Sequence, residues 1–207
     1  MVFEHGSVHH LQPIAMIYRE AFPESIQLFF AGKDPGRLLR LLTNAFAFLY
    51  LTGARIMIAR RSDNNQILGY CVYSSINSGQ RRTSLLIKNM GRILRLAGKC
   101  LRDLRFIEIG KLAANSILMW VHTRANQKLP RKHGRIMSIA VRPAAQGQGI
   151  GKELLTRVLS ELPKENVLLN VRPDNTPALS LYQNAGFTEC GMTKDLQGKW
   201  VMMIRRA

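Results

Sequence analysis

Acidic residues are scarce in this chain of 207 residues, where 13 Asp and Glu stand against 30 Lys and Arg and give a net charge of +17. Such an excess predicts an anionic partner: nucleic acid, an anionic membrane, or an acidic or phosphorylated ligand. The apolar run from Ala45 to Leu51 is far shorter than the roughly 20 residues of a membrane span. We therefore expect a soluble protein, or one that lies at most on a membrane surface.

Cysteine is also rare. Cys71, Cys100 and Cys190 are widely spaced and form neither a CxxC pattern nor a metal-binding one. We therefore expect reduced thiols, no bound metal and a cytoplasmic protein. Residues 1–13 lack the basic and apolar regions of a secretion signal, which agrees with that expectation. The positive charge leaves open a peripheral association with a membrane.

The first third of the chain has apolar residues at helical spacing in 14–30, where Pro23 interrupts the pattern, and again in 35–53. The period then changes. Residues 54–60 and 67–75 are rich in β-forming side chains and are joined by a polar turn, which predicts a hairpin. This part of the chain should therefore fold as helices followed by two antiparallel strands.

The last third predicts alternating elements. A strand over 135–141 leads through a glycine-rich loop into a helix that ends near Leu162, and a second strand covers 166–173. A short helix should begin near Asp174 or Asn175 and end at Gly186, and two final strands should follow. The order predicts one mixed α/β domain over 1–207, with residues 77–132 as a basic helical insertion.

The loop "RPAAQGQGIGKELL" (142–155) has three glycines at alternate positions before a helical pattern. It does not fit the Walker A pattern GxxxxGK[ST], because Gln146 stands five residues before Gly151 and Glu153 follows the lysine. It does not fit GxGxxG either, because Lys152 stands at the last position. What remains is a set of N–H groups at a helix N-terminus, an arrangement suited to a pyrophosphate.

These residues carry a family resemblance. Gln146-x-x-Gly149-x-Gly151 resembles the acetyl-CoA loop (Q/R-x-x-G-x-G/A) of the GNAT-type N-acetyltransferases, and "NVRPDNTPALSLYQNAGF" (170–187) is similar to the downstream motif of that superfamily. The resemblance is close over 134–207 and loose over 10–76. It implies a central, mostly antiparallel, splayed sheet flanked by helices, and acetyl-CoA as cosubstrate.

The resemblance assigns a role to each position of the loop and its neighbours. The backbone around Ile139, Ala140 and Val141 would pair with the pantetheine arm, and Asn175 would contact the CoA arm. Tyr182 would protonate the departing thiolate, as a nearby phenol can. The pyrophosphate would be held at Gln146, Gly147, Gln148, Gly149, Ile150, Gly151 and Lys152.

The general base is not evident. Asn170 stands where members related to the ribosomal-protein alanine acetyltransferases often have a glutamate, and an amide cannot accept a proton at neutral pH. Ser138 on the loop strand is no base either. The open alternatives are a water chain, an amine that arrives neutral, or a distant carboxylate or imidazole. Those distant candidates are Glu20, Glu24, His122 and His133.

Residues 77–132 carry 13 Lys and Arg but only two acids, Asp103 and Glu108. Within them, a basic stripe is expected to lie opposite an apolar stripe on one helix. The segment 81–105 has no aromatic side chain, which disfavours nucleic acid. An anionic membrane surface, a phosphorylated acceptor and a plain solvated surface helix all stay open, as does a homodimer. The basic stripe is Lys88, Arg92, Arg95, Lys99 and Arg102, and the apolar stripe is Leu86, Met90, Ile93, Ala97, Leu101 and Leu104.

The hypothesis from the sequence is therefore an N-acetyltransferase that transfers acetyl from acetyl-CoA to a primary amine by direct attack. A small amine or an amino sugar is the favoured acceptor, because an amine of low pKa needs no strong base. The alternatives are acetylation of a protein, at a ribosomal N-terminus or a lysine, and a non-catalytic regulatory module that binds acyl-CoA.

Overall fold

The computed structural model describes residues 1–75, 78–130 and 133–207, and the side chains of 78–83 are not described. Arg131 and Lys132 of the predicted insertion lie outside these ranges, and so do the side chains of Arg81 and Arg82. Within the described residues, eight strands form one sheet in the order β1-β2-β3-β5-β6-β8-β7-β4. The strands are β1 (Val2–His5), β2 (Arg55–Arg60), β3 (Ile67–Ser74), β4 (Arg124–Ala125), β5 (Gly134–Val141), β6 (Val167–Val171), β7 (Thr188–Asp195) and β8 (Gly198–Arg205).

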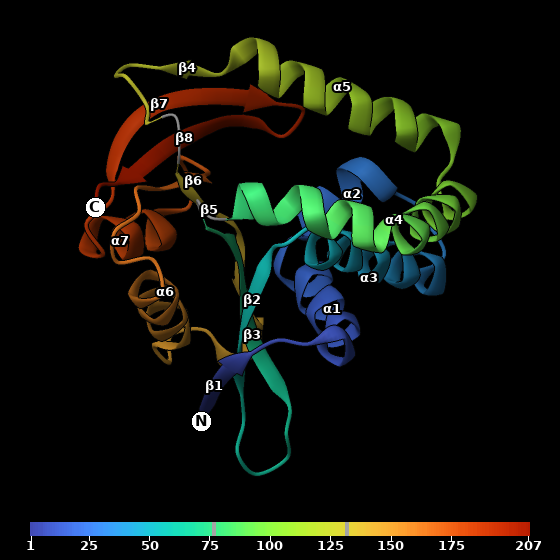
Figure 1. Ribbon diagram of the computed structural model, residues 1–207, viewed down its shortest axis with the longest axis horizontal. Coiled ribbons are helices and arrows are strands. Elements are labelled where there is room, and N and C mark those ends of the chain that lie inside the picture. The colour runs from blue at the N-terminus through green and yellow to red at the C-terminus, as the bar shows by residue number, and fades with distance from the viewer. Residues whose placement is uncertain (76–77, 131–132) are drawn as a thin grey trace.

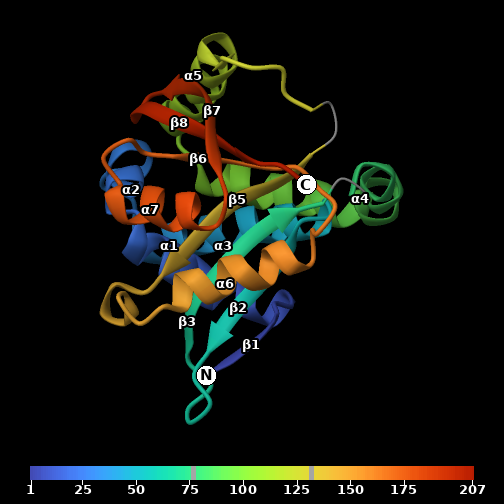
Figure 2. The same cartoon turned by 90° about the vertical axis from the view of Figure 1, so that its left-hand side faces the viewer.

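Helices cover both faces of the sheet (Figures 1 and 2). On one face, α1 and α3 enclose a core that contains Ile14, Phe46 and Tyr70. On the other face, α6 and α7 enclose a core that contains Leu154 and Tyr182. The helices are α1 (Leu11–Ala21), α2 (Pro23–Phe30), α3 (Pro35–Leu51), α4 (Ser78–Asp103), α5 (Phe106–His122), α6 (Ile150–Ser160) and α7 (Thr176–Asn184), with the short 3-10 turns η1 (Val8–His10) and η2 (Pro143–Ala145).

The sequence expectations for the first and last thirds are confirmed. Pro23 separates α1 from α2, because proline fits the first turn of a helix better than its interior. The predicted hairpin is β2 and β3, which pair antiparallel. Strand β1 was not predicted, although its four residues add a strand to the edge of β2. The open, mostly antiparallel sheet with flanking helices is the predicted fold class.

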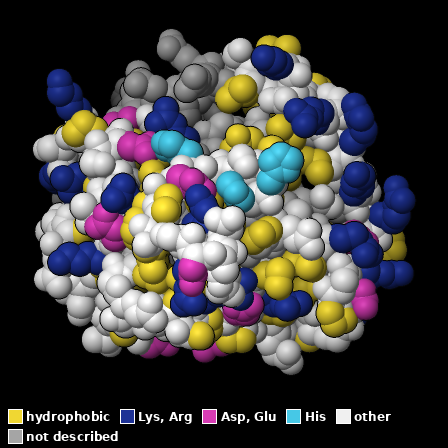
Figure 3. Space-filling view, turned by 90° about the horizontal axis from the view of Figure 1, so that it is seen from below, with side chains coloured by type: hydrophobic (Ala, Val, Ile, Leu, Met, Phe, Trp, Pro, Cys, Tyr) yellow, Lys and Arg dark blue, Asp and Glu magenta, His cyan; other side chains and the backbone are white. Residues whose placement is uncertain are grey.

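The basic segment folds as two helices joined at Leu104 and Arg105, and the positions of the predicted stripes lie on the first of them, apart from Leu104 at the junction. Helix α4 packs on α3, and α5 runs along the β7–β8 hairpin (Figure 1). Lys and Arg side chains gather along the right-hand edge of Figure 3, the side on which α3 and α4 lie. All five residues of the predicted basic stripe are exposed, as expected.

The predicted apolar stripe of α4 is only partly correct. Ile93 is buried and Leu86 is half-buried, but Met90, Ala97 and Leu101 face solvent. The docked face is rotated towards Asn89 and Cys100, because hydrogen bonds fix the helix: Asn89 donates to the Leu51 carbonyl, and Lys33 donates to the Asp103 carbonyl at the C-terminal end. Polar contacts with α3 and with the loop before it therefore set the rotation of α4.

Candidate active site

The two central strands of the sheet separate. β5 and β6 are parallel neighbours, yet they pair only at Gly134 with Val167 and at Arg135 with Leu168. Beyond Arg135 the register of β5 continues on β3 alone, up to Val141 opposite Gly69. The edge of β5 that faces β6 is therefore open along most of its length, at the point where the glycine loop begins.

Backbone groups of Ile139 and Val141 point to this open edge. The amide of Arg142 donates to the Leu68 carbonyl on β3 at 2.7 Å. Because successive residues of a strand present their N–H and C=O groups to opposite edges, Ile139 and Val141 present theirs towards β6. Ala140 lies between them with its backbone towards β3 and its side chain buried, so it cannot use the open edge.

The glycine loop connects β5 to α6 with two left-handed residues. Gly147 has φ +78° and Gly149 has φ +75°, a conformation that side chains rarely adopt. Gly149 caps α6, and the first backbone bond of the helix runs from the Glu153 amide to the Gly149 carbonyl. The amides of Ile150, Gly151 and Lys152 precede that bond, so they have no acceptor within the helix. Free amides at a helix N-terminus are an arrangement suited to an anion.

The loop also leaves room for a ligand. A side-chain carbon built on Gly147 or Gly149 would meet no atom within 4 Å. Ile150 is buried in the core and anchors the turn, so its contribution to a ligand is its backbone alone. An open edge strand followed by exposed amides fits the pantetheine and pyrophosphate of acetyl-CoA, and the chain's own residues supply the donors.

Helix α7 brings Asn175 and Tyr182 to this region. The side-chain oxygen of Asn175 accepts a hydrogen bond from the Ala178 amide at 3.1 Å, which caps the helix and leaves the amide NH₂ group available. Tyr182 is buried, with its ring edge-on to Phe187 at a centroid distance of 5.9 Å. Burial raises the pKa of Tyr182, so the phenol keeps its proton at neutral pH and can act as an acid.

The four distant base candidates lie in different parts of the structure. Glu20 is engaged by Arg142, whose Nη1 lies 2.8 and 2.9 Å from its two carboxylate oxygens. Glu24 is exposed on α2, and His122 is exposed at the end of α5. His133 precedes β5, and five residues at about 3.3 Å each separate it from Ser138 by roughly 16 Å. None of these geometries identifies a base.

The sequence did not predict a pair of hydroxyl groups on the α1 side of β5. The Tyr70 and Ser138 hydroxyls lie 2.9 Å apart, and burial raises the pKa of Tyr70. At the β7–β8 turn, Ser25 Oγ donates to Gln197 Oε1 at 2.6 Å, which joins α2 to the turn. Pairs that lie 68 and 172 residues apart along the chain leave no local sequence signal.

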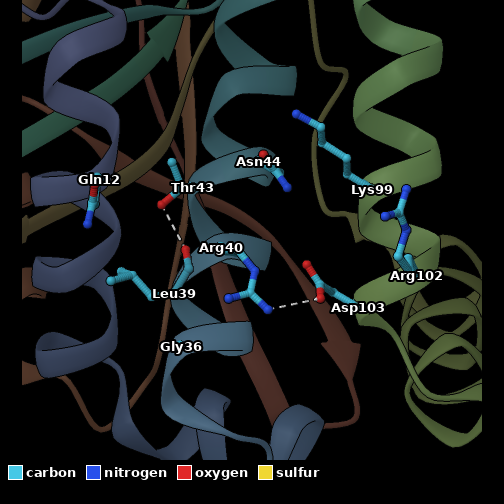
Figure 4. Close-up of a pocket in the computed structure, with 9 residues that line it drawn as sticks. All are labelled: Gln12, Gly36, Leu39, Arg40, Thr43, Asn44, Lys99, Arg102 and Asp103. Carbon is cyan, nitrogen blue, oxygen red and sulfur yellow. Dashed lines mark hydrogen bonds and ion pairs between the residues drawn. The ribbon is translucent and has the colours of Figure 1, made fainter.

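A separate cavity of about 600 Å³ lies between α1, α3 and α4 (Figure 4). Three cations line it, and one of them, Arg40, pairs with Asp103 at 3.5 Å. Lys99 and Arg102 of α4 complete the basic lining. None of the glycine-loop residues contributes to it, so this cavity is distinct from the opening between β5 and β6. Among the described residues, no cluster of three or more His, Cys, Asp or Glu could hold a metal ion.

The splayed sheet with its open strand edge beside a glycine loop is a fold shared with known acetyltransferase structures. The acetyltransferase (GNAT) family model matches residues 106–187. A Corynebacterium glutamicum structure described as histone acetyltransferase HPA2 and related acetyltransferase has a TM-score of 0.64 at 18% identity, and covers 99% of this chain and 95% of its own. An N-acetyltransferase from Staphylococcus aureus gives the same TM-score at 17% identity, with 99% and 100% covered. Residues 106–187 therefore match the GNAT acetyltransferase family model, and the chain as a whole shares its fold with these acetyltransferase structures.

Sequence relatives match over shorter stretches. N-alpha-acetyltransferase RimI of Mycobacterium tuberculosis is 42% identical over 59 residues, which are 28% of this chain and 37% of that protein. The mycothiol acetyltransferase of Pseudarthrobacter chlorophenolicus is 42% identical over 62 residues, 28% and 19% of the two chains. The Escherichia coli ribosomal protein bS18-alanine N-acetyltransferase is 35% identical over 89 residues, which are 42% of this chain and 54% of that protein. This chain therefore spans about half or less of these relatives.

Proposed function

We propose that this protein is an N-acetyltransferase that transfers acetyl from acetyl-CoA to the primary amine of a small molecule, with an amino sugar as the favoured class. The observation that carries the proposal is the open edge of β5 leading directly into the amides at the start of α6. A family whose cosubstrate is acetyl-CoA, and relatives named as N-acetyltransferases, support the same activity.

Each element of the site then has a task. When bound, acetyl-CoA supplies the thioester carbonyl that the amine attacks. The Ile139 and Val141 backbone orients the pantetheine arm as an added strand, and an amide on this edge stabilises negative charge on the carbonyl oxygen. The amides from Gly147 to Lys152 hold the pyrophosphate, and the Asn175 NH₂ group contacts the CoA arm. Tyr182 holds a proton for the leaving sulfur.

The acceptor argument rests on the missing base. Asn170 lies on β6 opposite Met202 and carries no proton-accepting group, and Glu20 is held by Arg142. A site in which no described residue is identified as the base favours an amine that is partly neutral at physiological pH. Amino sugars carry such amines, because the neighbouring oxygens withdraw electron density. Phosphorylated amines add the charge that the basic surface would attract.

A second candidate is acetylation of a protein N-terminus. It is supported by the relative named for alanine on ribosomal protein bS18. The relatives carry different acceptors in their names, mycothiol in one case and a ribosomal protein in another. Assays with both acceptor classes distinguish the two candidates.

The test is thiol release from acetyl-CoA with three panels: polyamines and simple amines, amino sugars with and without phosphate, and peptides beginning with alanine. Calorimetry measures acetyl-CoA binding in parallel. Turnover with an amino sugar supports the proposal, and turnover with peptides alone favours the second candidate. Acetyl-CoA binding without release for any acceptor would overturn both and leave a binding module.

A further inference from the structure

Helix α5 is oriented with its polar side inward. Lys111 Nζ donates to the Leu28 carbonyl at 2.7 Å, and the Asn115 side chain accepts from the Leu196 amide at 3.1 Å. Glu108 lies 2.8 Å from Lys33, with 1% and 3% of their side chains exposed. At the far end, the Thr193 hydroxyl donates to the Met119 carbonyl. The contacts that hold α5 on α2 and β7 are therefore largely polar.

The opposite side of α5 is apolar and faces solvent. The Phe106 side chain is 93% exposed, Ile117 61% and Trp120 83%. Positions 106, 110, 113, 117, 120 and 121 recur at helical spacing, so they share one face. Ile107 and Val121 widen this face, and Gly110, Ala113 and Ala114 lie between the large side chains. We call these residues the α5 outer face.

The α5 outer face carries no charge. The charged residues of the helix are Glu108 and Lys111, which both face inward, and His122 at its last position. A monomer seldom exposes a contiguous apolar surface of this kind without a partner for it. A helix that buries its polar side and exposes its apolar side is therefore expected to meet an apolar environment in use.

Cations stand at both ends of this face. Lys99, Arg102 and Arg105 precede Phe106, and Arg124 and Lys128 follow His122; all five are exposed. Glu108 and Asp103, the two acids of residues 77–132, are held by Lys33, Arg105 and Arg40 on the inner side. An uncharged apolar stripe with Trp and with cations at its ends is the pattern of a helix that lies in a membrane interface.

Helix α4 has a related composition on its exposed side. Ile87, Leu94 and Leu101 are 76%, 64% and 61% exposed, and their spacing of seven places them on one face. This apolar row runs beside the basic row that begins at Lys88 and ends at Arg102. In Figures 1 and 2, α4 and α5 both lie on the outside of the molecule. The two helices therefore present apolar and cationic side chains, but no described free acid, to the outside.

No described helix is long and apolar enough to cross a membrane, so contact with lipid would be along the surface. A second copy of the chain is a poorer occupant. Any pairing of two α5 outer faces brings the cations at the ends of one copy near those of the other, with no acid exposed between them, and like charges repel. Anionic lipid headgroups complement those cations, whereas acyl chains accept the apolar side chains.

We propose that the α5 outer face docks on the surface of an anionic lipid bilayer, with Phe106, Ile117 and Trp120 inserted at the level of the headgroups and first methylenes. Arg124 and Lys128 contact the lipid phosphates beyond the C-terminal end of the helix. The α5 outer face is separate from the proposed acetyl-CoA site, because α5 contacts α2 and β7 whereas the glycine loop precedes α6.

The experiment is co-sedimentation of the full chain with vesicles of phosphatidylcholine alone, or of equal parts phosphatidylcholine and phosphatidylglycerol. We expect recovery with the anionic vesicles alone, and a loss of binding as salt is raised. Phe106→Ser with Trp120→Ser should weaken binding at least about 10-fold, because two large apolar side chains no longer leave water. Phe48→Ser, an exposed apolar residue on α3, is the matched control and should bind normally.

Two further measurements decide between occupants. In a Trp200→Phe background, Trp120 emission should shift to shorter wavelength when anionic vesicles are added. Sedimentation velocity should give the same oligomeric state for the wild type and the double variant, without a dimer that depends on Phe106 and Trp120. Circular dichroism confirms that each variant is folded. Equal recovery with neutral vesicles, unchanged binding of the double variant, or a dimer that depends on Phe106 and Trp120 would each overturn the proposal.

Discussion

The guanidinium of Arg142 holds the carboxylate of Glu20, with one nitrogen 2.8 and 2.9 Å from its two oxygens. Arg142 is the first residue after β5, and its Nε also donates to the Ile67 carbonyl. One side chain thus ties α1 and β3 to the start of the glycine loop. The start of the glycine loop is thus joined to α1 by a pair separated by 122 residues in the sequence.

Glu20→Gln tests whether this carboxylate is structural or catalytic. We expect a loss of about 1.5 kcal/mol in the free energy of unfolding, because a hydrogen bond to a charged group is weakened. The kcat of the variant should stay within about twofold of wild type. Urea denaturation and thiol-release kinetics measure the two effects. A drop of about 100-fold in kcat at unchanged stability would instead make Glu20 the general base.

Gly149 provides a charge test of the loop. Asn and Asp have the same size, and both tolerate the left-handed conformation of this position better than other side chains. Gly149→Asp should bind acetyl-CoA at least about 10-fold more weakly than Gly149→Asn, because its carboxylate faces the phosphates. Calorimetry measures both affinities. Equal affinities for the two variants would remove the pyrophosphate from this loop.

Tyr182→Phe removes the proposed acid and keeps the ring in the core. We expect kcat to fall about 100-fold while KM for acetyl-CoA changes little. Tyr73→Phe is the matched control, since the Tyr73 hydroxyl donates to Glu161 at 2.5 Å and has no assigned role in transfer. An unchanged kcat in Tyr182→Phe would show that another group protonates the thiolate.

The same assignment has a pH consequence. Burial raises the pKa of Tyr182 above its ordinary value of 10.0, so the phenol stays protonated through the range in which most enzymes are assayed. The kcat of the wild-type enzyme should therefore show no alkaline decline below pH 10 from this group. A decline there that disappears in Tyr182→Phe would contradict the buried position of the phenol.

The buried pair of Lys33 and Glu108 should govern part of the acid stability. Burial by itself raises the pKa of Glu108, but hydrogen bonds from Arg105 and Lys33 outweigh it and lower the pKa below 4.5. A lowered pKa in the folded state means that the stabilisation is present above pH 4.5 and is lost as the pH falls through the folded-state value.

Glu108→Gln should therefore cost about 3 kcal/mol at pH 7, because it leaves the Lys33 ammonium buried without its counter-charge. The difference from wild type should shrink as the pH drops below 4.5. Glu153→Gln, which breaks an exposed pair with Arg157, should change the free energy of unfolding by less than about 0.5 kcal/mol. Urea denaturation across pH 3 to 7 measures all three proteins. A constant difference between wild type and Glu108→Gln would contradict the assigned pKa.

Local patterns predicted most elements of the fold. Pro23 and the helix cap at Asn175 act on the backbone of their sequence neighbours, so the sequence alone predicts their effect. β1 was missed because four residues carry too little pattern, and its pairing with β2 is settled across more than fifty residues. The sequence predicted a helical insertion over 77–132, but the stripes it identified end at Leu104, so the helix α5 and the side that it turns inward were found in the structure.

The candidate site likewise has parts that the sequence predicted and contacts that it could not predict. Spacing located the glycine loop, because amides at a helix N-terminus are produced by local chain geometry, and Tyr182 was assigned by the family resemblance of residues 170–187. Spacing could not find the contact between Tyr70 and Ser138 or that between Ser25 and Gln197, and it could not show that Glu20 is occupied by Arg142. Those contacts join residues that only the packing of α1, α2 and the sheet brings together.

The sequence by itself determined most of the elements, the glycine loop before a helix and the excess of positive charge, since each depends on local pattern or on composition. The tertiary structure alone decided that β5 and β6 separate beside that loop. It also decided that α5 turns Glu108, Lys111 and Asn115 inward and leaves Phe106 and Trp120 outside. The reason is that the residues that bind the polar side of α5, such as Lys33 and Leu196, are distant in the sequence. Their contacts with Glu108 and Asn115 determine which face of the helix is buried.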